Sequence, residues 1–256
     1  MFQLLPNAFA FELRKRLPRL RFTNYREVAA ANSLDPALLT SACEVFSASV
    51  VNGLNELSLR TNLFYHWILQ QISFGAETPS FETAVDLGSK HFVYAPALAA
   101  WAHREFGSRE IVGLEADPYR FYRDLYRRGD YAKYYCDLTQ AEFKQKVQIK
   151  YECENWLVSN RSASLITCFF PFLYGDLNQR WGLPKTFFDP AKFYQKTLSS
   201  AKAVVFFHQG EEEAVESERL ISNDASAKIV FKKQFFENPY MKRKFPVFAI
   251  VAIKAL

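Results

Sequence analysis

The sequence lacks the cysteine and histidine spacings that mark disulfide frameworks and common metal sites. Its four histidines show no HExxH or comparable ligand spacing, so no metal site is predicted. Its four cysteines are scattered without a CxxC pair, at Cys43, Cys136, Cys153 and Cys168. This usage fits reduced thiols in a cytoplasmic protein better than a disulfide framework.

Long apolar runs are also missing. No stretch of about 18 residues is free of charge, so a membrane-spanning helix is not expected. The N-terminus, MFQLLPNAFAFELRKRLPRLR, places its apolar part before its basic part, which is the reverse of a secretory signal. This order favours an amphipathic helix docked on the domain, with a membrane-surface or partner-binding helix as the alternative.

Several catalytic motifs are absent too, and the charge is mild. The chain has no Walker A sequence, no G-x-S-x-G elbow and no kinase signature. The net charge is +5, with basic clusters at residues 14–21 and 242–244. Such clusters occur in RNA-binding proteins and on ordinary solvated surfaces alike. We expect a small-molecule partner rather than nucleic acid, and nucleic acid stays open as an alternative.

The 256 residues suffice for one sizeable core. Residues 1–76 are predicted to form a helical N-terminal extension, because apolar periodicity runs through 36–51 and 57–72. Asp35 is placed as an N-cap before Pro36 at the first helical position. The segment GAETPS at 75–80 breaks the pattern, and a second region, 77–256, follows.

In this second region strands alternate with helices. Strands are predicted at 83–88, 111–115, 131–136, 163–170 and 203–208, with helices at 95–106, 118–128, 190–200 and 211–221. Such alternation indicates βαβ units and a parallel sheet. Two further strands, 228–235 and 245–254, have no helix between them and should pair antiparallel. We therefore predict an α/β, Rossmann-like three-layer sandwich with a seven-stranded, mostly parallel sheet and an antiparallel last strand.

Acidic residues follow the first three predicted strands. Asp86 and Gly88 end the first strand, Glu115 ends the second and Asp137 follows the third. Ligands of open α/β sheets lie beyond the carboxyl ends of the strands, so these residues are predicted to line a site.

The element order and the three acids resemble the class I S-adenosylmethionine (SAM) dependent methyltransferases. The resemblance covers about residues 80–256 and implies SAM as the cofactor. It implies that Asp86 acts on the amino group of SAM and that Gly88 lets the backbone approach its methionine part. It also implies that Glu115 accepts the ribose hydroxyls and that Asp137 reaches the adenine amino group.

The chain departs from the family in the loop after the first strand. The family repeats glycine here as D/E-x-G-x-G-x-G, but the second and third glycine positions hold Lys90 and Phe92. Either the loop takes another path or SAM is displaced. Lys90 is a candidate partner of the SAM carboxylate. Alternatively, Lys90 pairs with Asp86 or Glu115.

The other acids have structural alternatives as well. Asp117 is the natural N-cap of a helix starting at Pro118, and Glu115 could share that capping role. Asp137 could likewise cap a following helix rather than bind adenine.

Two candidate catalytic residues follow the fourth and fifth strands. The segment Phe169-Phe170-Pro171-Phe172-Leu173-Tyr174 keeps only the proline and aromatics of the Asn/Asp-Pro-Pro-aromatic motif of enzymes that methylate amide or base nitrogens. This disfavours those acceptors and favours a hydrophobic or planar one, with plain ring packing as the alternative. Tyr174 and His208 are the candidate catalytic groups, since histidine titrates near neutrality.

The favoured function is a SAM-dependent methyltransferase with a small, hydrophobic or planar acceptor. One alternative is a methyltransferase-like binding or scaffold protein that no longer catalyses, supported by Lys90 and Phe92 in the loop. Another is a Rossmann oxidoreductase that uses NAD, for which Glu115 would serve. The terminal hairpin and Asp86 argue against this last reading.

Overall fold

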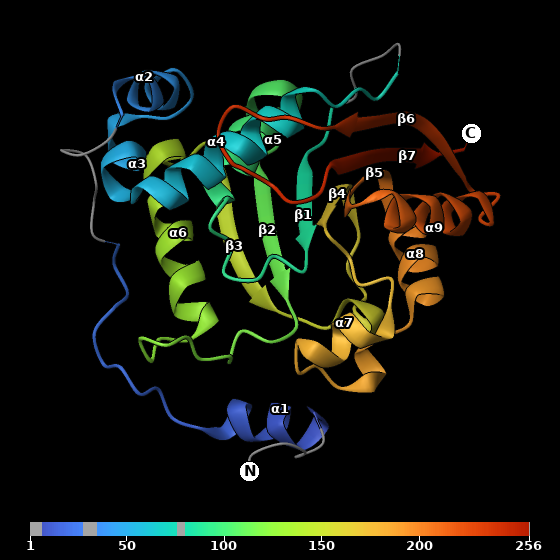
Figure 1. The fold of residues 1–256 in the computed structure, drawn as a ribbon, viewed down its shortest axis with the longest axis horizontal. Helices are drawn as coiled ribbons and strands as arrows, with labels where there is room; N and C mark the ends of the chain where they lie inside the picture. Colours follow the sequence, from blue (N-terminus) through green and yellow to red (C-terminus); the bar gives the residue numbers. More distant parts are fainter. Residues whose placement is uncertain (1–6, 28–34, 76–79, 256) are drawn as a thin grey trace.

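The computed structural model describes residues 7–27, 35–75 and 80–255, and a seven-stranded sheet lies at its centre (Figure 1). The strands are β1 Thr83–Leu87, β2 Glu110–Glu115, β3 Gln148–Cys153, β4 Ala163–Phe169, β5 Ala201–Gln209, β6 Ala227–Phe235 and β7 Val247–Lys254. Their order is β3-β2-β1-β4-β5-β7-β6. The first five are parallel, and β7 pairs antiparallel with both β5 and β6. The predicted sheet is confirmed, and with it the fold implied by the resemblance to class I methyltransferases.

Helices cover both faces of the sheet. On one face lie α4 Glu56–Gln70, α5 Ala95–Phe106 and α6 Arg128–Phe143, and on the other α8 Pro190–Ser199 and α9 Glu211–Ser222. Alternate strand residues feed the two cores, because successive side chains of a strand point to opposite faces. Ala84 belongs to the core under α4 to α6, and its neighbour Val85 to the core under α8 and α9. The three predicted layers are present (Figure 1).

The N-terminal helices occupy two places. Helices α2 (Pro36–Val45) and α3 (Ala48–Gly53) share the core of α4, and Asp35 caps α2 as expected by accepting from the Ala37 N–H. Helix α1 (Asn7–Arg16) lies apart from them, below the carboxyl ends of the strands (Figure 1). It is docked there, because Phe11 packs edge-on against Phe187 at 5.2 Å. The apolar residues 1–6 of the predicted helix lie outside the described residues.

Short helical turns complete the described chain around the same edge. They are α7 Gly175–Arg180 and the 3₁₀ turns η1 Trp156–Val158 and η2 Lys185–Phe187. Among the described helices, none has both the length and the apolar character needed to cross a bilayer.

Two predicted elements between β2 and β4 are wrong. Residues 118–127 form turns with one isolated bridge, Phe121 to Arg127, instead of a helix. The expected strand at 131–136 is the first part of helix α6. Its aromatic residues favour a strand in isolation. However, Ala132, Tyr135 and Thr139 are buried at helical spacing.

The third strand was missed because it lies at the edge of the sheet. Strand β3 reads Gln148-Ile149-Lys150-Tyr151-Glu152-Cys153, with polar and apolar residues alternating. An edge strand of a parallel sheet is half covered, so it carries charges that a central strand excludes. Its alternation is a strand signal, but its polar residues set it apart from the apolar runs that mark the central strands.

Candidate functional site

A cavity of about 480 Å³ opens at the carboxyl ends of the central strands. It lies where the strand order reverses between β1 and β4, the place at which open α/β sheets bind ligands. Its walls come from the segments after β1, β2, β3 and β4, from residues 177–190, and from the connection between β6 and β7. Ten residues of the wall are aromatic: Tyr65, Tyr94, Trp156, Phe169, Phe170, Phe172, Trp181, Phe187, Phe188 and Phe193.

The loop after β1 keeps a glycine-type backbone although only one glycine remains in it. Gly88, Lys90 and Phe92 have φ values of 72°, 53° and 53°. All three lie in the left-handed region, which ordinary side chains adopt at a cost of about 1–3 kcal/mol. Lys90 and Phe92 thus hold a backbone conformation that glycine adopts without this cost. Gly88 lies on the cavity wall, and a Cβ built on it meets no atom within 4 Å.

Phe92 turns away from the cavity and into the core. Its side chain is fully buried and packs against Gly113 of β2, where a Cβ would lie 2.8 Å from the Phe92 Cδ1. The bare backbone at Gly113 therefore makes room for the ring. Phe92 therefore does not fill the cavity.

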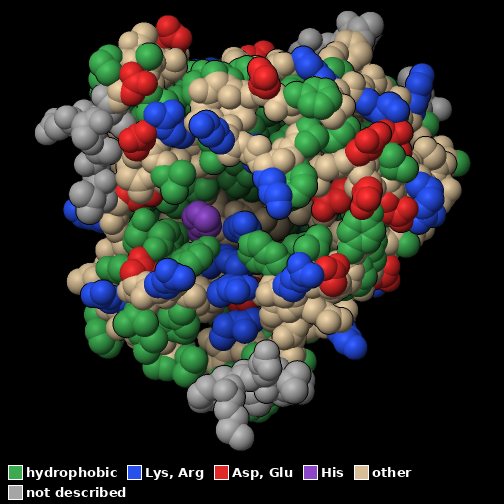
Figure 2. Space-filling model, in the orientation of Figure 1, with side chains coloured by type: hydrophobic (Ala, Val, Ile, Leu, Met, Phe, Trp, Pro, Cys, Tyr) green, Lys and Arg blue, Asp and Glu red, His purple; other side chains and the backbone are tan. Residues whose placement is uncertain are grey.

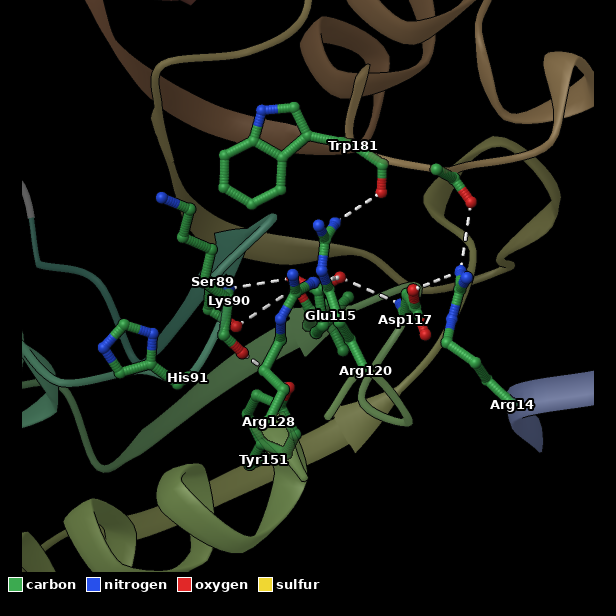
Figure 3. A network of polar contacts seen from close by, with 12 residues as sticks. Arg14, Ser89, Lys90, His91, Glu115, Asp117, Arg120, Arg128, Tyr151 and Trp181 are labelled. Carbon is green, nitrogen blue, oxygen red and sulfur yellow. Dashed lines mark hydrogen bonds and ion pairs between the residues drawn. The ribbon is translucent and has the colours of Figure 1, made fainter. Parts of the chain in front are cut away.

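Lys90 projects into the cavity, and its ammonium lies over the Trp181 indole at 4.2 Å from the ring centroid (Figure 3). The ammonium makes no ion pair with Asp86 or Glu115, so neither expected pairing is present. It is instead the backbone N–H of Lys90 that donates to Glu115 Oε2, at 2.8 Å. Burial and, to a smaller extent, the neighbouring Arg128 lower the pKa of Lys90 to about 8.

Glu115 ends β2 and lies on the cavity wall, almost fully buried. Its Oε1 accepts from the Asp117 N–H at 2.9 Å and from Arg128 Nη1 at 2.8 Å, and its Oε2 accepts from Lys90 (Figure 3). A carboxylate has about four lone-pair positions. One position on Oε2 is therefore left for a ligand.

Basic side chains surround the Trp181 ring from several directions. The guanidinium carbons of Arg120 and Arg128 lie 5.7 Å and 5.6 Å from its centroid, and Arg120 donates to the Trp181 carbonyl. Arg14 of α1 approaches from the far side and pairs with the buried Asp117 at 2.8 Å. Figure 2 shows Lys and Arg side chains gathered around a hollow near the centre of this face.

The structure places Asp86 behind the cavity wall rather than on it. Asp86 is fully buried, and its carboxylate accepts from Tyr94 Oη and Thr167 Oγ1, each at 2.7 Å. Burial raises the pKa of Asp86 to about 7, and the two hydrogen bonds oppose that rise. Tyr94, which donates to this carboxyl group, itself lines the cavity. Direct contact between Asp86 and a ligand is not available in this arrangement.

Asp137 lies outside the site, because the strand that was to position it does not exist. It is on the exposed side of α6, 65% accessible, and pairs with Lys133 one turn earlier at 2.8 Å. The segment that does follow β3 brings Glu154 and Asn155 to the cavity wall.

Neither candidate catalytic residue lines the cavity. His208 lies in β5 within the core, and burial lowers its pKa to about 3, which makes it unsuited to accept a proton near neutrality. Tyr174 lies on the surface beside the glutamates at the start of α9. The sequence could not show that the His208 side chain points into the core beneath α8 and α9, because alternate strand residues face opposite layers.

Among the cavity residues that the sequence analysis did not predict are Arg128, Trp181 and Arg243. Arg128 was assigned to the end of a helix that is absent, and Trp181 follows α7. Arg243 belongs to a basic triplet whose signal pointed only to surface charge. No group of three His, Cys, Asp or Glu side chains in the described part of the chain could hold a metal.

Comparison with known proteins finds likeness in fold alone. No protein-family model matches the chain, and no curated protein matches its sequence. A provisionally assigned RNA methyltransferase from Pyrococcus horikoshii is similar over 77% of this chain and 86% of its own, at 16% identity and a TM-score of 0.49. Magnesium protoporphyrin IX methyltransferase from Synechocystis PCC 6803 is similar over 88% and 100%, at 8% identity and 0.49. TrmN from Thermus thermophilus is similar over 76% and 49%, at 9% identity and 0.48, so the chain spans about half of TrmN.

Proposed function

We propose that the chain is a SAM-dependent methyltransferase acting on a small planar or hydrophobic acceptor. One observation carries the proposal: the glycine-type loop at Gly88 and the acid Glu115 meet on one wall of a cavity at the carboxyl edge of the sheet. The known structures add only that methyltransferases share this fold.

The residues on that wall fit the methyl donor in three places. The open space above Gly88 admits the methionine part of SAM close to the backbone. The remaining lone pair of Glu115 suits one ribose hydroxyl, rather than the two expected from the family pattern. The Lys90 ammonium is free of acidic partners within the described residues and suits the SAM carboxylate.

SAM, when bound, supplies a methyl group to a nucleophile of the acceptor. The chain's own contribution is to hold and orient the acceptor and to exclude water, and such positioning is the main source of rate in a transfer of this kind. The aromatic wall formed by Phe170, Phe172 and Trp181 offers flat apolar surfaces for that purpose. We assign no catalytic role to His208 or Tyr174, because neither reaches the cavity.

The N-terminal residues 1–76 are included in this proposal as a cap over the site. Phe11 of α1 packs on Phe187, which itself lines the cavity, and Phe64 of α4 lies beneath Arg243 of the wall. The unpaired cysteines support a cytoplasmic location.

A non-catalytic binding protein remains the second candidate, and one observation favours it. The Arg128 guanidinium forms an ion pair with the Glu115 carboxylate, which leaves this acid fewer positions to bind ribose. On that alternative the cavity has no affinity for SAM.

The role of Lys90 tests the proposal. Lys90→Ala is expected to weaken SAM binding about tenfold, because a charge-assisted contact is lost. Lys133→Ala, which removes an exposed lysine of α6, is the matched control and should bind as the wild type does. Calorimetric titration of the three proteins at low salt and at ~0.5 M salt measures both effects, and salt should weaken only the wild-type and control affinities appreciably. Unchanged SAM affinity in Lys90→Ala would remove the role given to Lys90.

A further inference from the structure

Two basic side chains of the cavity wall form no ion pair with an acidic side chain of the described residues. Every acidic side chain of the wall already has a partner among the described residues: Glu115 with Arg128, Glu154 with Arg161, Asp189 with the Lys192 N–H and Glu213 with the Gln209 N–H. Of the three basic residues on the wall, Arg128 is paired with an acid, whereas Lys90 and Arg243 are not. Two cations therefore face the cavity without a described counter-charge.

Arg243 comes from the connection between β6 and β7, which reaches back from the sheet edge toward α4 (Figure 1). Its guanidinium lies over the rings of Phe64 and Phe170, 5.0 Å and 4.8 Å from their centroids. These two contacts fix the position of the group but use none of its N–H donors. No acceptor for those donors is present in the described chain. Burial lowers the pKa of Arg243, so its charged form gains from an anion.

The surroundings of Arg243 are flat as well as basic. Tyr65, next to Phe64 in α4, stacks on Tyr94 at 4.2 Å and meets Phe169 edge-on at 4.6 Å. Arg243 is also close enough to Lys90 to lower its pKa. The two free cations thus act on one space between aromatic walls. If Lys90 binds the carboxylate of SAM, the N–H groups of Arg243 remain available to the acceptor molecule.

We propose that Arg243 binds the anionic group of a planar aromatic acceptor and so determines the specificity of the site. This inference rests on the function proposed above and adds the charge of the acceptor to it. A guanidinium presents paired N–H donors that match a carboxylate or a phosphate in two-point contact. The rings beside it bind the flat body of such a molecule. A neutral planar molecule would leave the half-buried guanidinium unpaired, which is unfavourable.

The experiment compares planar probes that differ in charge. Binding of 2-naphthoate, 2-naphthyl phosphate and neutral 2-naphthamide to the full chain is measured by calorimetry without SAM. The wild type is expected to bind at least one of the two anions about tenfold more tightly than the amide. The anion that shows the larger preference identifies a carboxylate or a phosphate as the natural group. Equal affinity for all three probes would overturn the inference.

Variants then assign the preference to Arg243. Arg243→Gln should abolish the preference while keeping the affinity for 2-naphthamide, and Arg243→Lys should retain part of it. Lys242→Gln removes the same charge from the exposed neighbouring position and should behave as the wild type. A preference that survives Arg243→Gln, or that Lys90→Ala removes instead, would contradict the assignment. An equal loss of affinity for all three probes in a folded Arg243→Gln protein would show that Arg243 has only a structural role.

A separate SAM titration of Arg243→Gln distinguishes this inference from the proposed function. SAM should bind this variant as tightly as the wild type, because Arg243 is assigned to the acceptor. A charge preference that depends on Arg243 in a protein without SAM affinity would refute the methyltransferase and keep the anion site. SAM affinity without a charge preference would support the methyltransferase and refute the anion site.

Discussion

Asp86 lies at the centre of the molecule and illustrates how one residue can match a family pattern and yet be used differently. Its carboxyl group is bound by Tyr94 and Thr167 and has no access to solvent. Burial raises its pKa to about 7, whereas the ordinary value is 3.8. The folded protein therefore holds a proton on Asp86 at pH values where the unfolded chain has released it.

This raised pKa makes stability depend on pH in a defined direction. Because the folded state binds the extra proton, the free energy of unfolding falls as pH rises from about 4 to about 7, by roughly 1–3 kcal/mol over pH 5–8. Asp86→Asn carries no titrating group at this position. The melting temperature of the variant minus that of the wild type should therefore increase as pH rises. Thermal melts of both proteins at pH 5, 6, 7 and 8 measure this gap. A gap that is constant across the series would show that Asp86 keeps an ordinary pKa.

Glu115 is the second residue whose surroundings set its role. It balances the buried Arg128, so Glu115→Gln should lower the free energy of unfolding by about 3 kcal/mol, since breaking a buried pair leaves an uncompensated charge. Glu110→Gln in the same strand is the control, because its partially exposed pair with Lys150 is worth under ~1 kcal/mol. Urea denaturation compares the two variants. Equal decreases in the free energy of unfolding of the two variants would contradict the stabilising role assigned to the buried pair.

Among the elements, β2 and the loop after β1 depend on each other. Phe92 adopts a positive φ and lies on the bare backbone of Gly113. The sequence shows both residues, but their contact follows from the parallel pairing of β1 with β2, which sets Asp86 beside Gly113. A motif search restricted to the loop therefore finds only that Lys90 and Phe92 stand where the family pattern has glycine.

Gly113→Ala tests this contact. The new Cβ would lie 2.8 Å from Phe92 and 2.9 Å from Ser89 Oγ, so the loop must shift, at a cost of about 1–3 kcal/mol. The double variant Gly113→Ala/Phe92→Leu should lose less stability than the sum of the two single variants, because the smaller side chain relieves the clash. Denaturant unfolding of the four proteins measures the coupling. Strict additivity would show that the ring and the glycine do not compete for space.

The elements also show where prediction from sequence succeeds. Helix α5 and the strands β1, β2, β4 and β5 were predicted within two residues at either end, because central strands are short apolar runs and α5 ends at a glycine. The region from 118 to 153 was misread, since its helix is rich in tyrosine and its strand is rich in charge. The error displaced one expected site residue, Asp137, and hid the segment that takes its place.

For the whole molecule, the sheet order and the place of the cavity follow from the alternation of elements, but the composition of the wall does not. Lys90, Arg128 and Arg243 come from three distant segments, and only the fold brings them to one space. The spacing of these residues along the chain does not predict that they lie close together in the fold. The two arginines of the site were for this reason absent from the sequence-based hypothesis, which placed only Lys90 there as a cation.

The claim that this cavity binds a methyl donor is tested most directly by calorimetric titration of the wild-type chain with SAM, S-adenosylhomocysteine and NAD. We predict one site per chain for SAM and for S-adenosylhomocysteine, because the two share the ribose and the carboxylate assigned to Glu115 and Lys90. NAD should give no heat, since the space above Gly88 is assigned to a methionine part that NAD lacks. A folded wild-type protein that binds neither SAM nor S-adenosylhomocysteine would contradict the methyltransferase and favour the non-catalytic alternative.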